Sequence, residues 1–406
     1  MTGDRTGLNA PTVQNLRHSN LAHLLAISGL HMGLFTGFFF ALLRLALICL
    51  PEPIRYGPTK QIAACGAILA GAAYLALSGG NVATESVFIM ALVAFAALLF
   101  EKCVLSVRSV ATAAFIVLVL RPEALLGPGF QMSFAATLAL VTVFSVWQAR
   151  EMKFGPRWIQ PVWILCLSSM VTGLATGPIA AAHFNIAAQY GLVDNLVYVP
   201  LMGVVIMPTG VVALLLMPFE LDGVALSVMG LGLDWILTVA DWVSHLEKAV
   251  IFVKAPSPVV LPLMAFSGLF LALWIGPFRA VGVLGIVVAS VFWGLTNRPV
   301  MLISDTGALI GVLTAKDRVL SKPKGAGFVA RNWLQNDGDK RHQAVVAERW
   351  VDLDEALTNQ VISPNIGRLD WAHVVSKKTI PAIVSCTLKQ VLSPQSLFIY
   401  LKHALC

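Results

Sequence analysis

Long uncharged apolar runs limit what this chain can fold into, because a helix needs about 20 mostly apolar residues to cross the hydrocarbon core of a membrane. Such runs recur from residue 24 to residue 297, and together they predict an all-α polytopic integral membrane protein with about ten transmembrane helices. Seven runs are clear, two are shorter, and the last, which contains Asp234 and Asp241, is the weakest. In that order, they are residues 24–43, 61–84, 124–149, 158–193, 195–219, 255–278, 280–297, 86–100, 104–120 and 223–246.

Charged residues are unevenly distributed along the chain. Only 12% of all residues are charged, against about 25% in an ordinary soluble domain. Residues 23–297 and the much shorter 298–406 each contain 23 Asp, Glu, Lys and Arg. This predicts a polar N-terminal segment (1–22), a membrane domain (23–297) and a soluble tail (298–406). It argues against a cytosolic enzyme, a nucleic-acid domain with one basic face and a disulfide scaffold.

Basic residues alternate between successive loops of the membrane domain. Lys and Arg collect in short loops on the cytoplasmic side. The alternation therefore predicts which loops face the cytoplasm, and it places both termini outside if there are ten helices. The loop with Lys248 and Lys254 departs from this pattern. The loops between the basic ones contain Arg121 or no basic residue. The first basic loop contains Arg44, Arg55 and Lys60, the second contains Lys102 and Arg108, and the third contains Arg150, Lys153 and Arg157.

The tail begins with a β-hairpin pattern. Two short apolar runs, residues 300–303 and 309–313, flank a turn at residues 305–307, which is typical of a hairpin. After Asp339 the pattern loses definition. The sequence therefore predicts a small soluble region with some β structure and no more specific fold.

The first of four polar clusters lies at the start of the first apolar run, with His23 directly before it and Ser28, Gly29 and His31 inside it. Polar groups inside a membrane are costly unless they find partners or line a wet cavity. The two histidines are eight residues apart and cannot bind one metal ion from a straight helix. Two interpretations remain: the side chains bond across helices while Gly29 allows close approach, or they line a conduction path.

Two further clusters lie between apolar runs. Asn81 lies near the end of the second run and Glu85 directly follows it, either as the cap of an external loop or as polar groups at a pore entrance. Residues 121–133 form a Pro- and Gly-rich turn that leads Gln131 and Ser133 into the next helix. Such a turn suits either a tight re-entrant segment buried in protein or an ordinary turn at the interface.

The fourth cluster contains His183, Asn195 and Pro200. The 36-residue uncharged run 158–193 is too long for one helix, so we expect the helix to break near His183 and the chain to follow the interface before it re-enters. Pro200 and Pro208 should then kink or break the next helix. Interrupted helices of this kind recur in transporters.

These stretches, in this order and with this spacing, resemble the membrane domain of the ComEC competence-protein family. The resemblance covers residues 3–297, with a weaker echo in the tail up to residue 339. It rests on HLLAISGLH at 23–31, LSGGN at 77–81, the run from Arg121 that ends in PGFQMSFAA at 128–136, His183–Phe184, Asn195 and Pro200 in the membrane domain, and on Phe328 and WLQNDGD at 333–339 in the tail.

The resemblance implies a channel in the bacterial inner (plasma) membrane that passes single-stranded DNA into the cell during natural transformation. It implies no enzymatic activity, cofactor or metal. Its expected partners are single-stranded DNA, the lipid bilayer, DNA-receptor and motor proteins, and further copies of the chain. His23, Ser28, His31, Gln131, Ser133, His183 and Asn195 are the motif positions on which this rests.

The chain also departs from the family. Full-length members usually have a further N-terminal region, and some end in a metallo-β-lactamase-like domain. Here His342, His373 and His403 are isolated from one another and build no such metal centre. We therefore expect a chain shortened at both ends relative to full-length members.

Two other functions stay open from the sequence. One is a non-conducting remnant or scaffold that has lost function through truncation. The membrane domain has only 12 basic against 11 acidic residues, which counts against a channel, because single-stranded DNA needs a basic path. The other is an intramembrane serine hydrolase that uses Ser28 and His183. The sequence contains no phosphate-binding P-loop, so a channel would need a partner or the membrane potential as its energy source.

Overall fold

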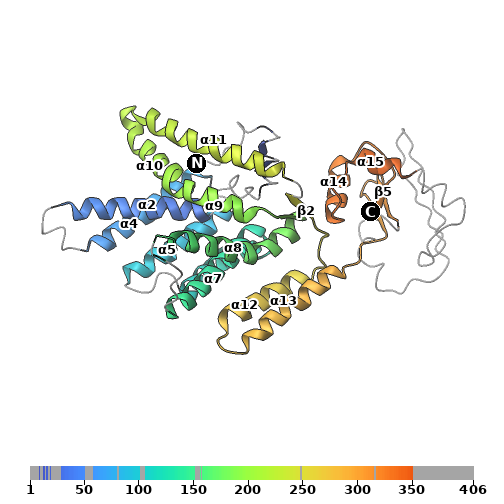
Figure 1. Cartoon of the computed structure of the whole chain (residues 1–406), viewed down its shortest axis with the longest axis horizontal. Helices are drawn as coiled ribbons and strands as arrows, with labels where there is room; N and C mark the ends of the chain where they lie inside the picture. The colour runs from blue at the N-terminus through green and yellow to red at the C-terminus, as the bar shows by residue number, and fades with distance from the viewer. Residues whose placement is uncertain are drawn as a thin grey trace, which may run out of the picture. The chain divides into compact units, whose positions relative to one another are not determined.

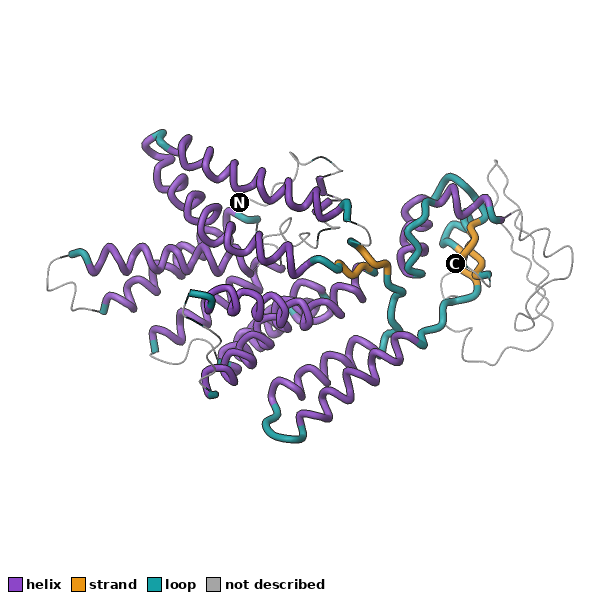
Figure 2. The backbone as a smooth tube through the Cα atoms, in the orientation of Figure 1, coloured by secondary structure: helices purple, strands orange, loops and turns teal. Residues whose placement is uncertain are grey.

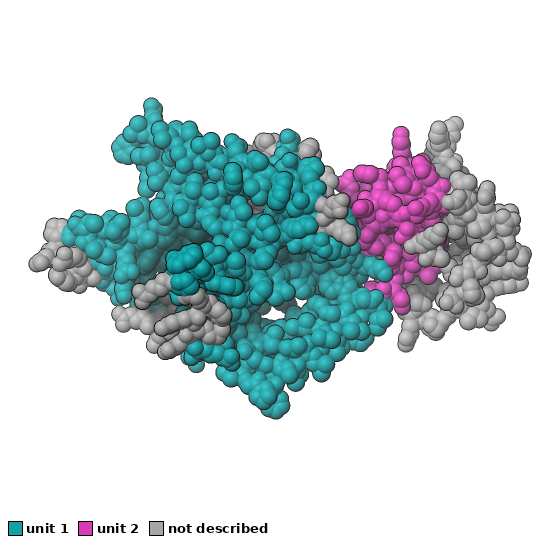
Figure 3. All heavy atoms as spheres, in the orientation of Figure 1, with its two compact units in different colours: residues 1–295 teal, residues 296–406 magenta. Residues whose placement is uncertain are grey.

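The chain divides into two compact units, residues 1–295 and residues 296–406 (Figure 3). We describe each unit by itself. The structure is a computed structural model. It describes residues 29–50, 58–79, 82–100, 106–150, 158–246, 249–314 and 317–350, together with residues 9, 12, 13, 15, 16, 19 and 156.

Unit 1 is mostly helical (Figures 1 and 2). Helices that follow one another in the sequence pack side by side, most extensively α12 with α13, α7 with α8, and α2 with α4. The helices are α2 (Gly29–Ile48), α4 (Thr59–Leu77), α5 (Val82–Leu99), α6 (Val107–Leu120), α7 (Pro128–Ala149), α8 (Gln160–Phe184), α9 (Gly191–Leu201), α10 (Met207–Leu216), α11 (Asp222–Ser244), α12 (Val260–Leu273) and α13 (Arg279–Gly294), with short turns η2 (Pro122–Leu126) and η4 (Met217–Phe219).

Within the part of the chain that the structure describes, six helical segments are long and apolar enough to cross a membrane. The other apolar helices, such as α6 and α12 with 14 residues each, rise only about 21 Å at 1.5 Å per residue. That falls short of a hydrocarbon core of about 30 Å. The membrane character that the sequence predicts is therefore supported, but the count of about ten spans is not confirmed. The six segments are Gly29–Ile48, Thr59–Leu77, Pro128–Ala149, Gln160–Phe184, Gly191–Phe219 and Asp222–Ser244.

The predicted break near His183 is confirmed. Helix α8 ends at Phe184, and Asn185 adopts a left-handed conformation with φ 57°, which is a common way to end a helix. The next residues form β1 (Ile186–Ala188), which pairs antiparallel with β2 (Val250–Phe252). The Asn185 side chain also donates a hydrogen bond to the carbonyl of Val253 at 3.3 Å. A two-stranded ribbon thus fixes the connection between α8 and α9.

The segment from α9 to α10 is interrupted, as the two prolines predict. A π-helical turn, η3 (Met202–Ile206), lies between Pro200 of α9 and Pro208 of α10. Proline lacks the N–H that would continue the regular ladder, and π turns often occur at functional positions. At this turn Gly232 of α11 approaches closely, since a Cβ atom there would lie 3.1 Å from Ile206.

Unit 2 contains a three-stranded antiparallel sheet with the order β3 (Met301–Ile303), β4 (Ile310–Leu313) and β5 (Arg318–Leu320). The predicted hairpin is confirmed as β3 and β4, whereas the third strand was not predicted. Helices α14 (Gly327–Asn336) and α15 (Gln343–Glu348) complete the unit. Its core comprises Leu309, Leu320, Ala330, Leu334, Val346 and Ala347.

A buried ion pair joins the sheet of unit 2 to the end of α14. The Arg318 side chain is fully buried and donates from Nε to the Asp337 carboxylate at 2.5 Å, and from Nη2 to the carbonyl of Pro299 at 2.9 Å. Nearby, burial alone would raise the pKa of Asp339, but hydrogen bonds from Arg341 outweigh it and lower that pKa. The acidic residues of the stretch 333–339 are thus bound up in ion pairs within the unit.

We predict that Asp337→Ala destabilises unit 2 by about 3–5 kcal/mol, because it leaves the Arg318 guanidinium buried without its counter-charge. Hydrogen exchange of peptides from residues 299–350 in the full chain measures this. Asp305→Ala is the matched control, since Asp305 is an exposed acid in the β3–β4 turn. Equal amide protection in the two variants would show that the ion pair does not hold the unit together.

Candidate functional site

Described residues of all four polar clusters lie at one end of the helices of unit 1, which we call the motif end; of the fourth cluster, Pro200 lies further along, in the last turn of α9. Sequential helices run in opposite directions, so alternate connections share an end, as the paths of α2, α4, α7 and α8 show (Figure 1). The motif end is where α2, α5, α7 and α9 begin and where α4, α6 and α8 end. It therefore includes His31 in the first turn of α2, Glu85 in the first turn of α5, Gln131 in the first turn of α7, His183 in the last turn of α8, and Asn195 in the second turn of α9.

Glu85 and Arg121 join the second cluster to the third. Arg121 follows the last residue of α6, and its guanidinium binds the Glu85 carboxylate through two bonds, Nη2 to Oε1 at 3.0 Å and Nε to Oε2 at 2.6 Å. The Arg121 and Glu85 side chains are 41% and 29% exposed. Both line a pocket of about 400 Å³ whose remaining wall is apolar, with Leu75, Phe88, Ile89 and Leu120. Glu85 is thus a paired carboxylate beside a cavity.

Gln131 and His183 join the third cluster to the fourth. The Gln131 amide donates from Nε2 to the carbonyl of Leu125 in η2 at 2.9 Å, which leaves its Oε1 to accept from His183 Nε2, also at 2.9 Å. With that assignment, His183 carries a hydrogen on Nε2. Ser133 lies two residues further along α7, and its carbonyl accepts a hydrogen bond from Thr137. One amide therefore ties the start of α7 to its own preceding turn and to the end of α8.

The first cluster lies beside the second. Gly29 begins α2, and a Cβ atom there would be 3.7 Å from Val87 of α5, so these two helices are in contact at the motif end. His31 is half-buried. The remaining predicted positions, His23, Ser28 and Asn81, lie outside the described residues, and so the interpretations that rest on them stay predictions.

Asp194 lies in the fourth cluster but is not among the site positions predicted from the sequence. Its side chain is 1% exposed, and neither carboxylate oxygen has a hydrogen-bond partner. Within the described part of unit 1 it is the one buried charged residue, directly before Asn195 and six residues before the exposed Pro200. The signal was present in the sequence, since Asp194 is the one charged residue between Arg157 and Glu220.

An isolated carboxylate in this position is expensive. Ionisable groups inside a membrane are rare, face the bundle interior or a wet cavity, and mark ion or substrate pathways. A buried carboxylate is not needed to hold the helices together, because an apolar side chain would fill the same space without the desolvation cost. Asp194 therefore belongs to the candidate site on physical grounds. Among the described residues, no group of three or more His, Cys, Asp and Glu comes together as a metal site would require.

Comparison with known proteins places these features in a family. The sequence profile of a family described as "Competence protein" matches residues 1–278. Over 261 residues the chain is 26% identical to "ComE operon protein 3" of Bacillus subtilis (strain 168). That alignment covers 64% of this chain and 31% of the relative, so the chain spans about a third of the length of the curated relative it matches. No solved structure matches the chain.

We predict that Gln131→Leu lowers the free energy of unfolding of unit 1 by about 1 kcal/mol, because half-buried His183 and the carbonyl of Leu125 lose their hydrogen bonds to the amide. Thermal unfolding of the purified chain in detergent measures this change. Gln148→Leu is the control, since Gln148 lies on the same helix and is exposed. An equal midpoint for the two variants would contradict a structural role for the bond to His183.

Proposed function

The chain belongs to the competence protein family, and from that membership we propose that it is a multi-pass channel protein of the bacterial plasma membrane that admits single-stranded DNA during natural transformation. The family and the similarity to ComE operon protein 3 support a role in competence. The observation that carries the channel itself is the gathering of the four polar clusters at the motif end. A mere membrane anchor needs no such assembly.

The chemistry of the motif end suits a passing polyanion. Single strands bind to grooves that combine positive charge with stacking surfaces. Arg121 is half-exposed and beside a pocket that also contains Phe88, so a phosphodiester could displace Glu85 from it. The amide of Gln131, the imidazole of His183 and the side chain of Asn195 add neutral hydrogen-bonding groups. Such groups can follow a backbone without holding it too tightly to move.

In this proposal the chain conducts and does not catalyse. A DNA receptor delivers the strand, a motor protein supplies the energy, and further copies of the chain complete the path where one copy is too narrow. The proposal competes with a non-conducting remnant or scaffold, and with a serine hydrolase that uses Ser28. Only the channel hypothesis requires both the gene and the buried carboxylate of Asp194 for DNA uptake. A substitution of Asp194 therefore separates the channel from the other two hypotheses.

We predict that Asp194→Asn lowers DNA uptake more than about tenfold without lowering the unfolding temperature of the protein, because the amide keeps the shape but removes an ionisable group from the path. Labelled DNA uptake is measured in a strain that lacks the gene and is rescued with each variant. Asp234→Asn is the matched control, since Asp234 lies on α11 and is exposed. It should restore wild-type uptake.

Three outcomes would contradict this proposal. Uptake that persists in the deletion strain would reject the channel and leave the remnant or scaffold. Full rescue by Asp194→Asn would remove Asp194 from the conduction path. Loss of rescue with Ser28→Ala, together with cleavage of a membrane substrate by the wild-type chain, would favour the hydrolase.

A further inference from the structure

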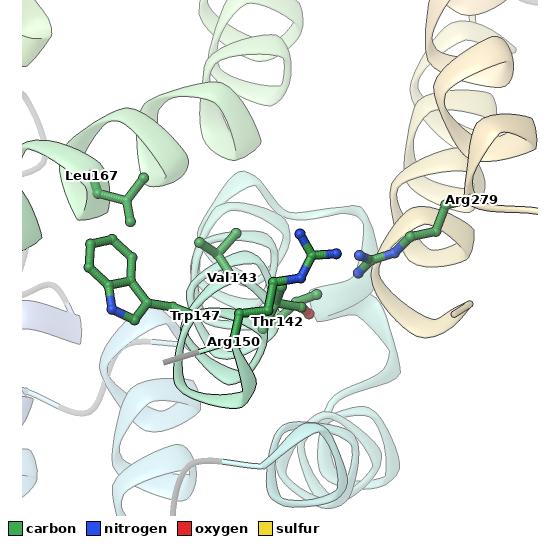
Figure 4. A pocket seen from close by; sticks show the side chains of 7 residues that line it. Thr142, Val143, Trp147, Arg150, Leu167 and Arg279 are labelled. Atoms are coloured by element: carbon green, nitrogen blue, oxygen red, sulfur yellow. The ribbon is translucent and has the colours of Figure 1, made fainter. Parts of the chain in front are cut away.

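A second pocket of unit 1 lies at the end opposite the motif end, which we call the basic end because Arg150 closes α7 there and Arg279 opens α13 there. The pocket has a volume of about 300 Å³ and is formed by α7, α8 and α13 (Figure 4). It is lined by Thr142, Val143, Val146, Trp147, Arg150, Leu167 and Arg279. None of these residues belongs to the four polar clusters.

The two guanidinium groups point toward one another across this pocket (Figure 4). Arg279 is held in place by a hydrogen bond from its Nε to the carbonyl of Leu271 at 3.0 Å, which leaves its terminal nitrogens directed at Arg150. Among the described residues neither arginine forms an ion pair, and no acidic side chain lines the pocket; residues 151–155 lie outside that part of the chain. Two like charges held together repel each other. An anion between them would turn this repulsion into attraction.

A third polar group lies near the pocket. The hydroxyl oxygen of Thr142 is buried and has no hydrogen-bond partner, and Figure 4 shows it beside the two guanidinium groups. A hydroxyl without a partner is rare in folded proteins. Arg150 and Arg279 together form a polar head that would suit the oxygen atoms of one phosphodiester, since arginine binds such oxygens through paired hydrogen bonds.

The rest of the pocket is apolar. Val143 and Val146 of α7 and Leu167 of α8 line it, and Trp147 lies next to Leu167 on the side away from Arg279 (Figure 4). Tryptophan is enriched where membrane and water meet, and the loop after α7 is one of the basic loops that the sequence assigns to the cytoplasmic side. Inorganic phosphate or a DNA strand would satisfy the arginines and leave this apolar wall uncovered. A lipid satisfies both parts at once.

We propose that this pocket binds an anionic phospholipid of the cytoplasmic leaflet. The headgroup phosphodiester lies between Arg150 and Arg279. One acyl chain lies along Val143, Val146 and Leu167. Basic pockets between membrane helices on the cytoplasmic side are suited to such headgroups, and the bound lipid would fasten α13 to the α7–α8 pair.

Native mass spectrometry of the purified full chain with added phosphatidylglycerol tests the proposal, with phosphatidylcholine as the uncharged comparison. We expect phosphatidylglycerol to bind more tightly, and Arg150→Gln and Arg279→Gln each to weaken it about fivefold, as each arginine near a lipid surface contributes about this factor. Arg108→Gln is the matched control, because Arg108 lies in the first turn of α6, is exposed and lies outside the pocket. It should bind like the wild type.

Two further variants keep the test decisive if a glutamine variant fails to fold. The doubly substituted Arg150→Lys, Arg279→Lys chain keeps both charges and should retain phosphatidylglycerol binding. Val146→Trp fills the apolar part without altering charge and should abolish it. Equal binding of the two lipids, or unchanged binding in the glutamine variants, would overturn the proposal. So would displacement of the lipid by inorganic phosphate, or a preference of the same arginines for a single-stranded oligonucleotide, since either ligand would make the apolar wall irrelevant.

Discussion

Hydrocarbon offers no hydrogen-bond partner to a polar group, and this one constraint organises unit 1. Inside the helices the backbone satisfies itself, so the side chains there can be almost entirely apolar. Polar side chains cost less free energy where helices end and the chain turns, because hydrogen-bond partners are present there. Glu85 with Arg121, and Gln131 with His183, are both pairs between a helix start and a helix end, which is where free carbonyls, turns and neighbouring helices supply partners.

Asp194 is an exception to this constraint, because it is polar and buried but has no hydrogen-bond partner. It stands in the first turn of α9, and yet it is buried with both oxygens unpartnered. The elements around it are also irregular: the strand pair β1–β2 fixes the chain before α9, and the π turn η3 follows Pro200. A helix that served only to fill the bundle would need neither irregular backbone nor a carboxylate. The combination is the strongest physical reason to treat the α8–α10 region as functional.

The sequence predicted the helices well because apolar run length is a local property, but it placed their boundaries poorly. The run 124–149 became η2 and α7, since Gly127 and Pro128 end one turn and start the next helix. The break after His183 could be predicted because 36 uncharged residues exceed one span, whereas its form, a left-handed Asn185 and a strand partner 64 residues away, depends on tertiary contacts. The pairs of the candidate site, Glu85 with Arg121 and Gln131 with His183, also depend on tertiary contacts and could not be predicted from the sequence. In unit 2, strand β5 was missed because its first residue, Arg318, is an arginine whose burial depends on the distant Asp337.

The two ends of unit 1 treat charge in opposite ways, and this bears on how a strand would move. At the motif end Arg121 is already paired, while at the basic end Arg150 and Arg279 face each other without a carboxylate among the described residues. A membrane potential that is negative inside opposes the inward movement of an anion by about 2.3 kcal/mol per charge for each 100 mV. Near-neutral walls cannot offset that cost for a chain of phosphates. If DNA enters through this unit, the pull must therefore come from a protein that acts on the strand beyond the basic end, and the unit itself need only keep the path wet and the strand loosely held.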